Sequence, residues 1–258
     1  MIRRSFIILP RVGKATELKM WRSGVACWDD FLAKDNIPGL SGDRKEGMNV
    51  ALEDADRYLH AGRADYFTSL LPSVEQWRLF SRFGEDAAYL DIETDGLGSH
   101  AHTTMVSVHC KGSTRTLIRG IDLTGEALAS ALQGARMLVT YNGSSFDLPM
   151  LQKEFPFVVP RLPHFDLRHG AARVGMPGGL KRLEVEFGIR RPQEVAYVTG
   201  EDAVYLWKLW LKGRENALKL LMKYNQEDTV NLATLAPQIE AMLLRKVDDD
   251  IRRAGRGR

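Results

Sequence analysis

Residues 87–97 read AAYLDIETDGL, and the run from Ala87 to Glu93 predicts a β-strand. Side chains alternate between the two faces of a strand, so Asp91 and Glu93 point to one face and Leu90 points to the other. The residues before Asp91 are apolar and predict a buried strand, in which two neighbouring carboxylates carry a large desolvation cost unless a cation compensates them. A divalent metal ion, Mg²⁺ or Mn²⁺, is the simplest compensation because both ions prefer hard oxygen ligands. A strand end that emerges into solvent is the alternative explanation of this pair.

The segments that follow this strand predict the fold class. Two further strands come after short turns, at Thr103 to Cys110 and Thr114 to Arg119, which suits an antiparallel meander. Helices and strands then alternate, which implies parallel neighbours: a helix at 125–133, a strand at 136–141, a helix at 146–155 and a strand at 164–167. This order is that of a ribonuclease-H-like fold, so we predict an α/β architecture with a mixed five-stranded sheet flanked by helices. Further helices are predicted at 179–187, 201–211 and 215–235, and Pro237 predicts a break after the last of them.

The first 84 residues have a different pattern and predict a mainly helical region. Phe6 to Leu9 is a short strand candidate, and the apolar residues from Met48 to Leu59 recur at helical spacing. Ser73 and Gln76 form a capping-box pattern at the start of a further helix, whose apolar side is predicted to carry Val74, Trp77, Phe80 and Phe83. We therefore divide the chain into a mainly helical N-terminal region, residues 1–84, and an α/β domain with a basic C-terminal tail, residues 85–258.

The composition is that of an ordinary globular protein. With 258 residues, 44% hydrophobic and 27% charged, the sequence excludes disordered and collagen-like chains. Cys27 and Cys110 cannot form a disulfide framework, and no apolar run reaches the roughly 18 residues of a membrane helix, so we expect a soluble cytoplasmic protein without a membrane partner. The formal charge of +3 is concentrated near the C-terminus, in Arg252, Arg253, Arg256 and Arg258. Such a tail is either a solvated end or a phosphate-contacting arm, so charge alone does not identify a nucleic-acid enzyme.

Two later segments carry further acidic side chains. Asp147 opens a predicted helix after the turn that begins at Asn142, a position where the helix dipole alone also favours an aspartate. Tyr224 and Asp228 lie four residues apart on a long helix, so the phenol and the carboxylate can face one site together. A tyrosine one turn from an aspartate is also common on amphipathic helices. Each segment alone therefore leaves an ordinary structural explanation open.

Taken together, these three segments resemble the motifs of a known family. The patterns D-x-E, N-x-x-x-F-D and Y-x-x-x-D stand here as Asp91-Ile-Glu93, Asn142 to Asp147 and Tyr224 to Asp228. They resemble the DEDD, or DnaQ-like, 3′–5′ exonuclease superfamily in its tyrosine subgroup. Within it the chain is most similar to YprB-like ribonuclease-H-like domains, and that similarity also covers His164 to Leu167, Gly179 to Glu184, and Gly13 to Glu17 with Trp21 and Trp28. The resemblance spans nearly the whole chain.

This resemblance implies a 3′–5′ exonuclease that uses two divalent ions, Mg²⁺ or Mn²⁺. The implied catalytic residues are Asp91, Glu93, Asp147, Tyr224 and Asp228, and the four acidic ones are the implied metal ligands. Asp91 would bridge the ions, and Tyr224 would orient the attacking water, since a phenol with a pKa of about 10 is a poor base. The implied substrate-binding residues are Thr94, Leu97, Asn142 and Lys181. Asp95 departs from the threonine that many relatives carry at this turn.

The implied substrate is the 3′ end of single-stranded nucleic acid, with DNA favoured over RNA. Two alternatives stay open: a non-catalytic nucleic-acid-binding module with the same fold, and an endonuclease or ribonuclease that uses the same site. Asp166 is either a further carboxylate near the metal ions or a partner of Arg168 or Arg173. Four basic residues are candidates for phosphate contacts, namely Lys181, Arg182, Arg190 and Arg191.

Overall fold

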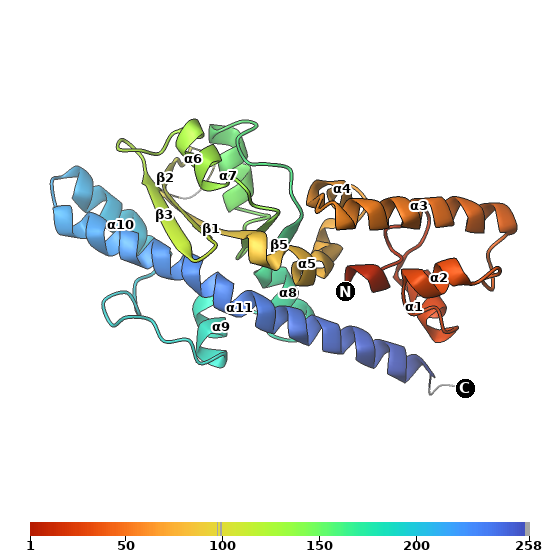
Figure 1. Ribbon diagram of the computed structural model, residues 1–258. Coiled ribbons are helices and arrows are strands. Elements are labelled where there is room, and N and C mark those ends of the chain that lie inside the picture. The colour runs from red at the N-terminus through yellow and green to blue at the C-terminus, as the bar shows by residue number, and fades with distance from the viewer. Residues whose placement is uncertain (97, 99, 256–258) are drawn as a thin grey trace.

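A mixed five-stranded β-sheet forms the centre of the fold in a computed structural model that describes residues 1–96, 98 and 100–255 (Figure 1). Its strands are β1 (Ala87–Thr94), β2 (Thr103–Cys110), β3 (Ser113–Ile118), β4 (Met137–Thr140) and β5 (His164–Asp166). The spatial order is β3-β2-β1-β4-β5. β2 pairs antiparallel with β1 and β3, whereas β4 lies parallel to β1 and β5. The predicted ribonuclease-H-like mixed sheet of five strands is confirmed.

Helices cover both faces of this sheet. On one face lie α6 (Gly125–Ala131) and α7 (Asp147–Glu154), whose leucines pack with Leu90 and Ile92 of β1. The other face is covered by α8 (Leu167–Arg173), α10 (Gly200–Leu211) and α11 (Glu215–Gly255), and α9 (Leu180–Glu186) packs beside α11. Because Tyr89 packs with residues of α11, the odd-numbered residues of β1 face this helix. Asp91 and Glu93 therefore point toward α11.

The N-terminal region is helical, as expected. Its elements are η1 (Ile2–Arg4), α1 (Lys14–Arg22), α2 (Trp28–Ala33), α3 (Gly42–His60), α4 (Ala64–Thr68), η2 (Ser73–Leu79), α5 (Phe80–Phe83) and η3 (Gly84–Asp86). Buried side chains of this region, such as Phe31 and Leu79, belong to the same hydrophobic cluster as Tyr89 of the sheet and Leu235 of α11. The two predicted regions thus share one core, and a domain boundary at residue 84 stays a prediction.

The strand expected at Phe6 to Leu9 is wrong. These residues form turns, and the N–H of Leu9 donates to the Phe6 carbonyl at 2.9 Å. The N–H groups of Phe6 and Ile7 donate to the buried carboxylate of Glu17, at 2.7 and 3.3 Å, and not to a neighbouring strand. The apolar side chains of the run are buried in the helical core, which accounts for the pattern without a sheet.

The capping box expected at Ser73 and Gln76 is also wrong. This segment is the 3-10 helix η2, its Ser73 makes no side-chain cap, and Val74 is 52% exposed. The amide of Gln76 instead donates to the carbonyl of Thr68 at 3.0 Å and accepts from the N–H of His164 at 2.8 Å. Gln76 therefore connects the N-terminal region to the edge strand β5.

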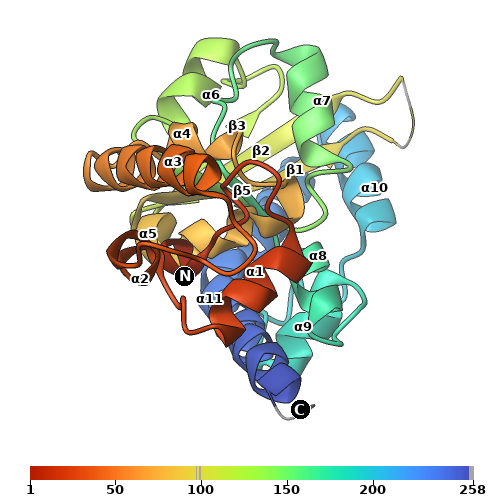
Figure 2. The same cartoon turned by 90° about the vertical axis from the view of Figure 1, so that its right-hand side faces the viewer.

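The break expected at Pro237 does not occur, because α11 continues through this residue for a total of 41 residues. Proline supplies no N–H to the carbonyl four residues earlier, but Pro237 lies on the exposed side of α11, where water can replace the missing donor. In Figures 1 and 2 the helix runs from the sheet to the neighbourhood of α1. Near its far end, Arg4 donates to Asp248 at 2.8 Å. None of the described helices is both long and apolar enough to span a lipid bilayer.

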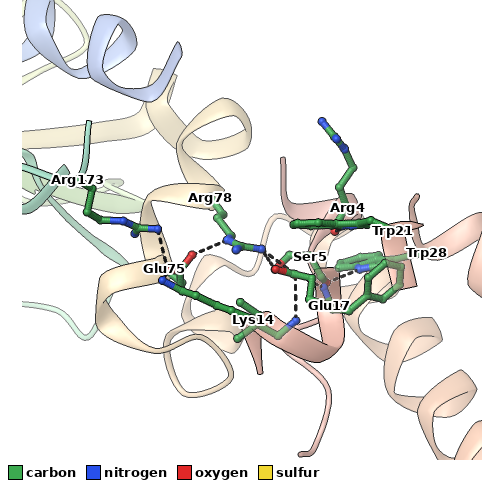
Figure 3. A network of polar contacts seen from close by, with 11 residues as sticks. Arg4, Ser5, Lys14, Glu17, Trp21, Trp28, Glu75, Arg78 and Arg173 are labelled. Carbon is green, nitrogen blue, oxygen red and sulfur yellow. Dashed lines mark hydrogen bonds and ion pairs between the residues drawn. The ribbon is translucent and has the colours of Figure 1, made fainter. Parts of the chain in front are cut away.

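A buried network of charged side chains connects α1, η2 and α8 (Figure 3). The guanidinium of Arg78 lies between two carboxylates, 2.8 Å from Glu17 and 2.7 Å from Glu75, and all three side chains are at most 3% exposed. Lys14 and Arg173 also pair with Glu75, at 2.7 and 3.0 Å. Because Arg173 belongs to α8, this network ties the N-terminal helices to the α/β domain.

Candidate metal centre

Three carboxylates from two elements lie together at the carboxyl end of β1. Asp91 and Glu93 come from β1 and Asp228 comes from α11, and one oxygen of each lies within 4.8 Å of the others. Glu93 and Asp228 are buried, and Asp91 is partly exposed. The alternation of β1 and the packing of α11 across it therefore produce the cluster that the sequence pattern predicts.

Asp147 lies beside this cluster but is not one of the three. It occupies the first turn of α7 and is 3% exposed. Its Oδ1 accepts a hydrogen bond from the N–H of Ile92 at 3.1 Å, at the residue between Asp91 and Glu93. Its charge raises the pKa of both β1 carboxyls. The sequence predicted four neighbouring acidic residues. In the structure three of them lie close enough to share one metal ion. The fourth, Asp147, accepts from the backbone N–H of Ile92 beside them.

Burial makes these carboxyl groups reluctant to ionise. Burial is the largest cause that raises the pKa of Asp91 and Glu93 well above their ordinary values, and the neighbouring acidic charges add to it. For the same first reason the pKa of Asp147 rises to about 7 and that of Asp228 to about 6, although Arg191 lowers the latter. When these carboxyl groups do ionise, their negative charges lie close together, and a bound cation would stabilise the ionised form.

Tyr224 lies against the cluster with its ring buried. Its hydroxyl is close enough to Asp228 to lower the pKa of that carboxyl group. Burial, followed by the charges of Asp228, Glu93 and Asp91, raises the pKa of the phenol far above its ordinary value of 10.0. The hydroxyl therefore keeps its proton in the metal-free protein, in which it is suited to position a neighbouring atom.

Arg191 and Glu184 belong to this site, and the sequence did not reveal their role. Two nitrogens of the Arg191 guanidinium each lie 2.6 Å from an oxygen of Glu184, and one of them also pairs with Asp228. Because the Arg191 side chain is only 4% exposed, it is a partner of buried carboxylates and not the exposed phosphate contact for which it was a candidate. The sequence Arg190-Arg191 does not indicate that one of the two side chains is buried, because the burial of Arg191 depends on carboxylates from other segments of the chain.

Asn225 is a second contributor without a sequence signal. Its Nδ2 donates to Oδ2 of Asp91 at 2.7 Å, so it orients the central carboxylate of the cluster. Its Oδ1 is buried and has no hydrogen-bond partner within the described residues. Such an acceptor fits a water molecule held by a metal ion.

The expected substrate-binding residues lie around the cluster in different ways. Thr94 lines a cavity of about 570 Å³ next to Glu93, together with Ile92, Phe146, Thr199, Gly200, Glu201 and Val204. Asn142 has a positive φ of 65° and accepts from Arg168 at 2.7 Å. Lys181 reaches toward Tyr224, with its ammonium nitrogen 5.4 Å from the ring centre. Leu97 lies outside the residues that the structure describes.

Asp166 pairs with Arg168, as one of the two alternatives from the sequence had it, but through the backbone N–H of Arg168 and not through its guanidinium. It is not part of the three-carboxylate group, and within the described chain the Arg168 and Arg173 side chains bond to Asn142 and Glu75 instead. Its carboxylate accepts from the N–H groups of Asn142, Ser144 and Arg168, at 2.9 to 3.1 Å, and from the Ser144 hydroxyl at 2.5 Å. Asp166 therefore holds the loop between β4 and α7, which positions Asp147.

The stability of the metal-free protein is expected to fall as the pH rises from about 5 to about 8. Asp147 and Asp228 release their protons near pH 7 and 6 in the folded chain but near their ordinary value of 3.8 when unfolded. Between these pH values the folded state binds more protons than the unfolded state, so the free energy of unfolding falls as the pH rises. The stability that Asp147 and Asp228 contribute is therefore full below pH 3.8 and is lost as the pH rises through 6 and 7. Melting temperatures measured across this range check the trend.

Addition of Mg²⁺ or Mn²⁺ is expected to reverse this loss, because ligands that bind only the folded state stabilise it. The melting temperature at pH 8 should rise with the ion and fall again with a chelator. Asp147→Asn is the matched variant, and its pH dependence without metal should be flatter. A melting temperature that rises with pH in metal-free wild type would contradict the electrostatic description.

Comparisons with known proteins agree with this architecture. The family model of the RNase_H superfamily matches residues 88–239. The uncharacterized protein YprB of Bacillus subtilis (strain 168) is 33% identical over 169 residues, which are 57% of this chain and 40% of that protein. The chain thus spans less than half the length of this relative. Among solved structures, the family B DNA polymerase of the archaeon Pyrobaculum calidifontis matches 59% of this chain and 24% of its own, with a TM-score of 0.48 and 17% identity.

Proposed function

Because this chain belongs to the RNase_H superfamily, we propose that it is a metal-dependent 3′–5′ exonuclease acting on single-stranded nucleic acid, with DNA favoured over RNA. The observation that carries the proposal is the group of Asp91, Glu93 and Asp228, in which one oxygen of each lies within 4.8 Å of the others. We also propose that residues 85–258 form the catalytic domain and that the protein acts in the cytoplasm.

The donor set fits hard divalent ions. All the ligands are carboxylate oxygens, which suit Mg²⁺ and Mn²⁺ and do not suit soft metals. In the proposal Asp91, Glu93 and Asp228 hold one ion, and Asp91 with Asp147 holds a second. A bound pair of such ions would stabilise the charge that develops on the phosphoryl group and on the attacking and leaving oxygens.

The residues around the cluster would organise the reacting groups. Tyr224 keeps its proton and lies beside Asp228, so it would help to orient this carboxylate and a water molecule next to it. Asn225 fixes Asp91 through the 2.7 Å hydrogen bond. Arg191 restrains Asp228 by its ion pair. These contacts hold the carboxylates in place before any ligand arrives, which lowers the cost of organising the site.

The cavity beside Glu93 supports an action at strand ends. Its volume of about 570 Å³ lies within the usual range of small-ligand pockets and suits one nucleoside. Ile92, Phe146 and Val204 give it apolar walls that fit a base and a sugar, while Glu93 stands at its edge. A terminal nucleoside in this cavity would place the following phosphate next to the carboxylates.

Purified protein with Mg²⁺ or Mn²⁺ is expected to shorten a 5′-labelled single strand stepwise from its 3′ end. A chelator should stop the reaction, and a strand whose 3′ end is blocked should resist it. Gel electrophoresis of time points from DNA and RNA strands in parallel would reveal the ladder and the sugar preference.

A circular single strand separates this proposal from its alternatives. An exonuclease leaves the circle intact, whereas an endonuclease or a ribonuclease that cleaves within strands converts it to linear products. A non-catalytic module would bind both substrates and degrade neither. Cleavage of the circle, or intact linear strands after prolonged incubation with either metal ion, would overturn the proposal.

A further inference from the structure

Tyr197 is exposed in a way that the fold does not require. It lies between α9 and α10, and 87% of its surface is accessible. A large aromatic ring loses hydrophobic stabilisation when it stays in water, and aromatic side chains that are displayed to solvent are typical of binding surfaces. The Tyr197 ring is therefore a candidate contact for a binding partner.

The backbone that carries Tyr197 is anchored on both sides. The ammonium group of Lys181 donates to the carbonyl of Ala196 at 3.4 Å and to the carbonyl of Val198. Val195 is fully buried, and its N–H donates to the Pro192 carbonyl at 3.0 Å. Tyr197 thus projects from a restrained segment, so its exposure does not result from a loosely held loop.

The same lysine connects this segment to the metal centre. Its ammonium nitrogen, which holds the two carbonyls around Tyr197, lies 5.4 Å from the centre of the Tyr224 ring. Thr199 follows two residues after Tyr197 and lines the cavity that also contains Glu93 and Thr94. The segment that carries Tyr197 therefore adjoins the cavity through Thr199 and the Tyr224 ring through Lys181.

The chain from α9 to Tyr197 carries exposed groups that suit a polyanion with aromatic bases. Arg182 on α9 and Arg190 in the segment before Tyr197 are exposed. Exposed guanidinium groups attract phosphates, and an exposed ring stacks on a base of any sequence. A base inside a duplex has both faces covered by its neighbours, so only an unpaired base can lie on the ring.

We infer that Tyr197 stacks on an unpaired base of the strand whose 3′-terminal nucleoside occupies the cavity beside Glu93, and so selects single-stranded substrates. The inference rests on the proposed function, because that function brings a strand end to the cavity. Lys181 then acts as a positioning residue, since it holds the Tyr197 segment next to the Tyr224 ring.

Binding of fluorescein-labelled oligonucleotides, measured by anisotropy with Ca²⁺ in place of Mg²⁺, tests the stacking without cleavage. Tyr197→Ala should weaken binding of a single strand by about 5- to 100-fold, the range that loss of one stacked base gives. Tyr197→Phe and Tyr197→Trp should bind like wild type. The matched control is Phe157→Ala, which removes a ring that is 93% exposed outside the α9–α10 segment and should change nothing.

Oligonucleotides that lack a single base locate the contact. For wild type, removal of the base at one position near the 3′ end should weaken binding as much as Tyr197→Ala does, and the two changes together should add nothing further. Equal binding by Tyr197→Ala and wild type, or fully additive losses at every position, would overturn the inference. Either result leaves the proposed function intact if the wild-type protein still shortens strands. A wild-type protein that binds strands but never cleaves them would disprove the proposed function and would leave the stacking inference standing.

Discussion

Asp91→Asn is expected to reduce strand cleavage by at least about 1,000-fold, because it removes the central charge that would hold the divalent ions. The amide has nearly the same shape as the carboxyl group and can still accept the hydrogen bond from Asn225. Loss of activity would therefore reflect the missing charge and not a collapsed site. Initial rates on end-labelled strands, measured at saturating Mg²⁺, give the ratio.

The same substitution is expected to stabilise the metal-free protein. Asp91 is destabilised by burial and by the charges of Asp228, Asp147 and Glu93, so a neutral side chain removes this repulsion. The melting temperature at pH 8 without metal should rise, and the further rise caused by Mg²⁺ in wild type should disappear. Asp95→Asn is the matched control, because Asp95 lies just beyond the end of β1 and bonds to His102 outside the cluster. An Asp91→Asn protein that retains wild-type rates would refute the metal centre.

Arg78→Met is expected to lower the free energy of unfolding by about 3–5 kcal/mol, the usual cost of removing one partner from a buried ion pair. The change leaves the carboxylate of Glu17 buried without its guanidinium and removes one of the cations around Glu75. Denaturant unfolding at equilibrium measures the loss. Because the network also includes Arg173 of α8, the contact between the N-terminal helices and the sheet should loosen.

Two further variants make this prediction specific. Arg63→Met removes an exposed arginine that pairs with Asp65, and it should leave the unfolding midpoint unchanged. Replacing Glu17 and Glu75 by glutamine in the Arg78→Met background should recover much of the lost stability, since no buried charge then lacks a partner. A single Arg78→Met variant as stable as wild type would show that the network contributes little.

Much of the fold could be predicted because its signals are local. The turn signals between the first three predicted strands and the helix–strand alternation that follows are visible within single segments, and they predict five strands and their pairing directions. The facing of Asp91 and Glu93 follows from strand geometry alone, and the spacing of Tyr224 and Asp228 follows from helix geometry alone. Only the resemblance to a known family predicted that Asp91 and Glu93 lie next to Asp228 in the folded chain.

The predictions that were wrong depend on contacts between distant segments. Phe6 to Leu9 is apolar enough for a strand. The N–H groups of Phe6 and Ile7 donate to the Glu17 carboxylate, however, and therefore do not pair with a neighbouring strand. Gln76 bonds to β5, which the pattern of its own helix does not indicate. Arg191 is buried because Glu184 and Asp228 surround it, although its sequence neighbourhood is that of a basic surface. Local patterns hold no information about such partners.

The unbroken course of α11 has a consequence for any attempt to shorten the protein. With 41 residues at about 1.5 Å each, the helix is roughly 60 Å long, and it carries Asp228 near one end and Asp248 near the other. A fragment that begins at residue 85 would keep the whole helix but would lose the α1 neighbours and the Arg4 contact of its distal half. Loss of these neighbours would expose leucines such as Leu243, which favours aggregation, so a workable truncation must also shorten the distal end of α11.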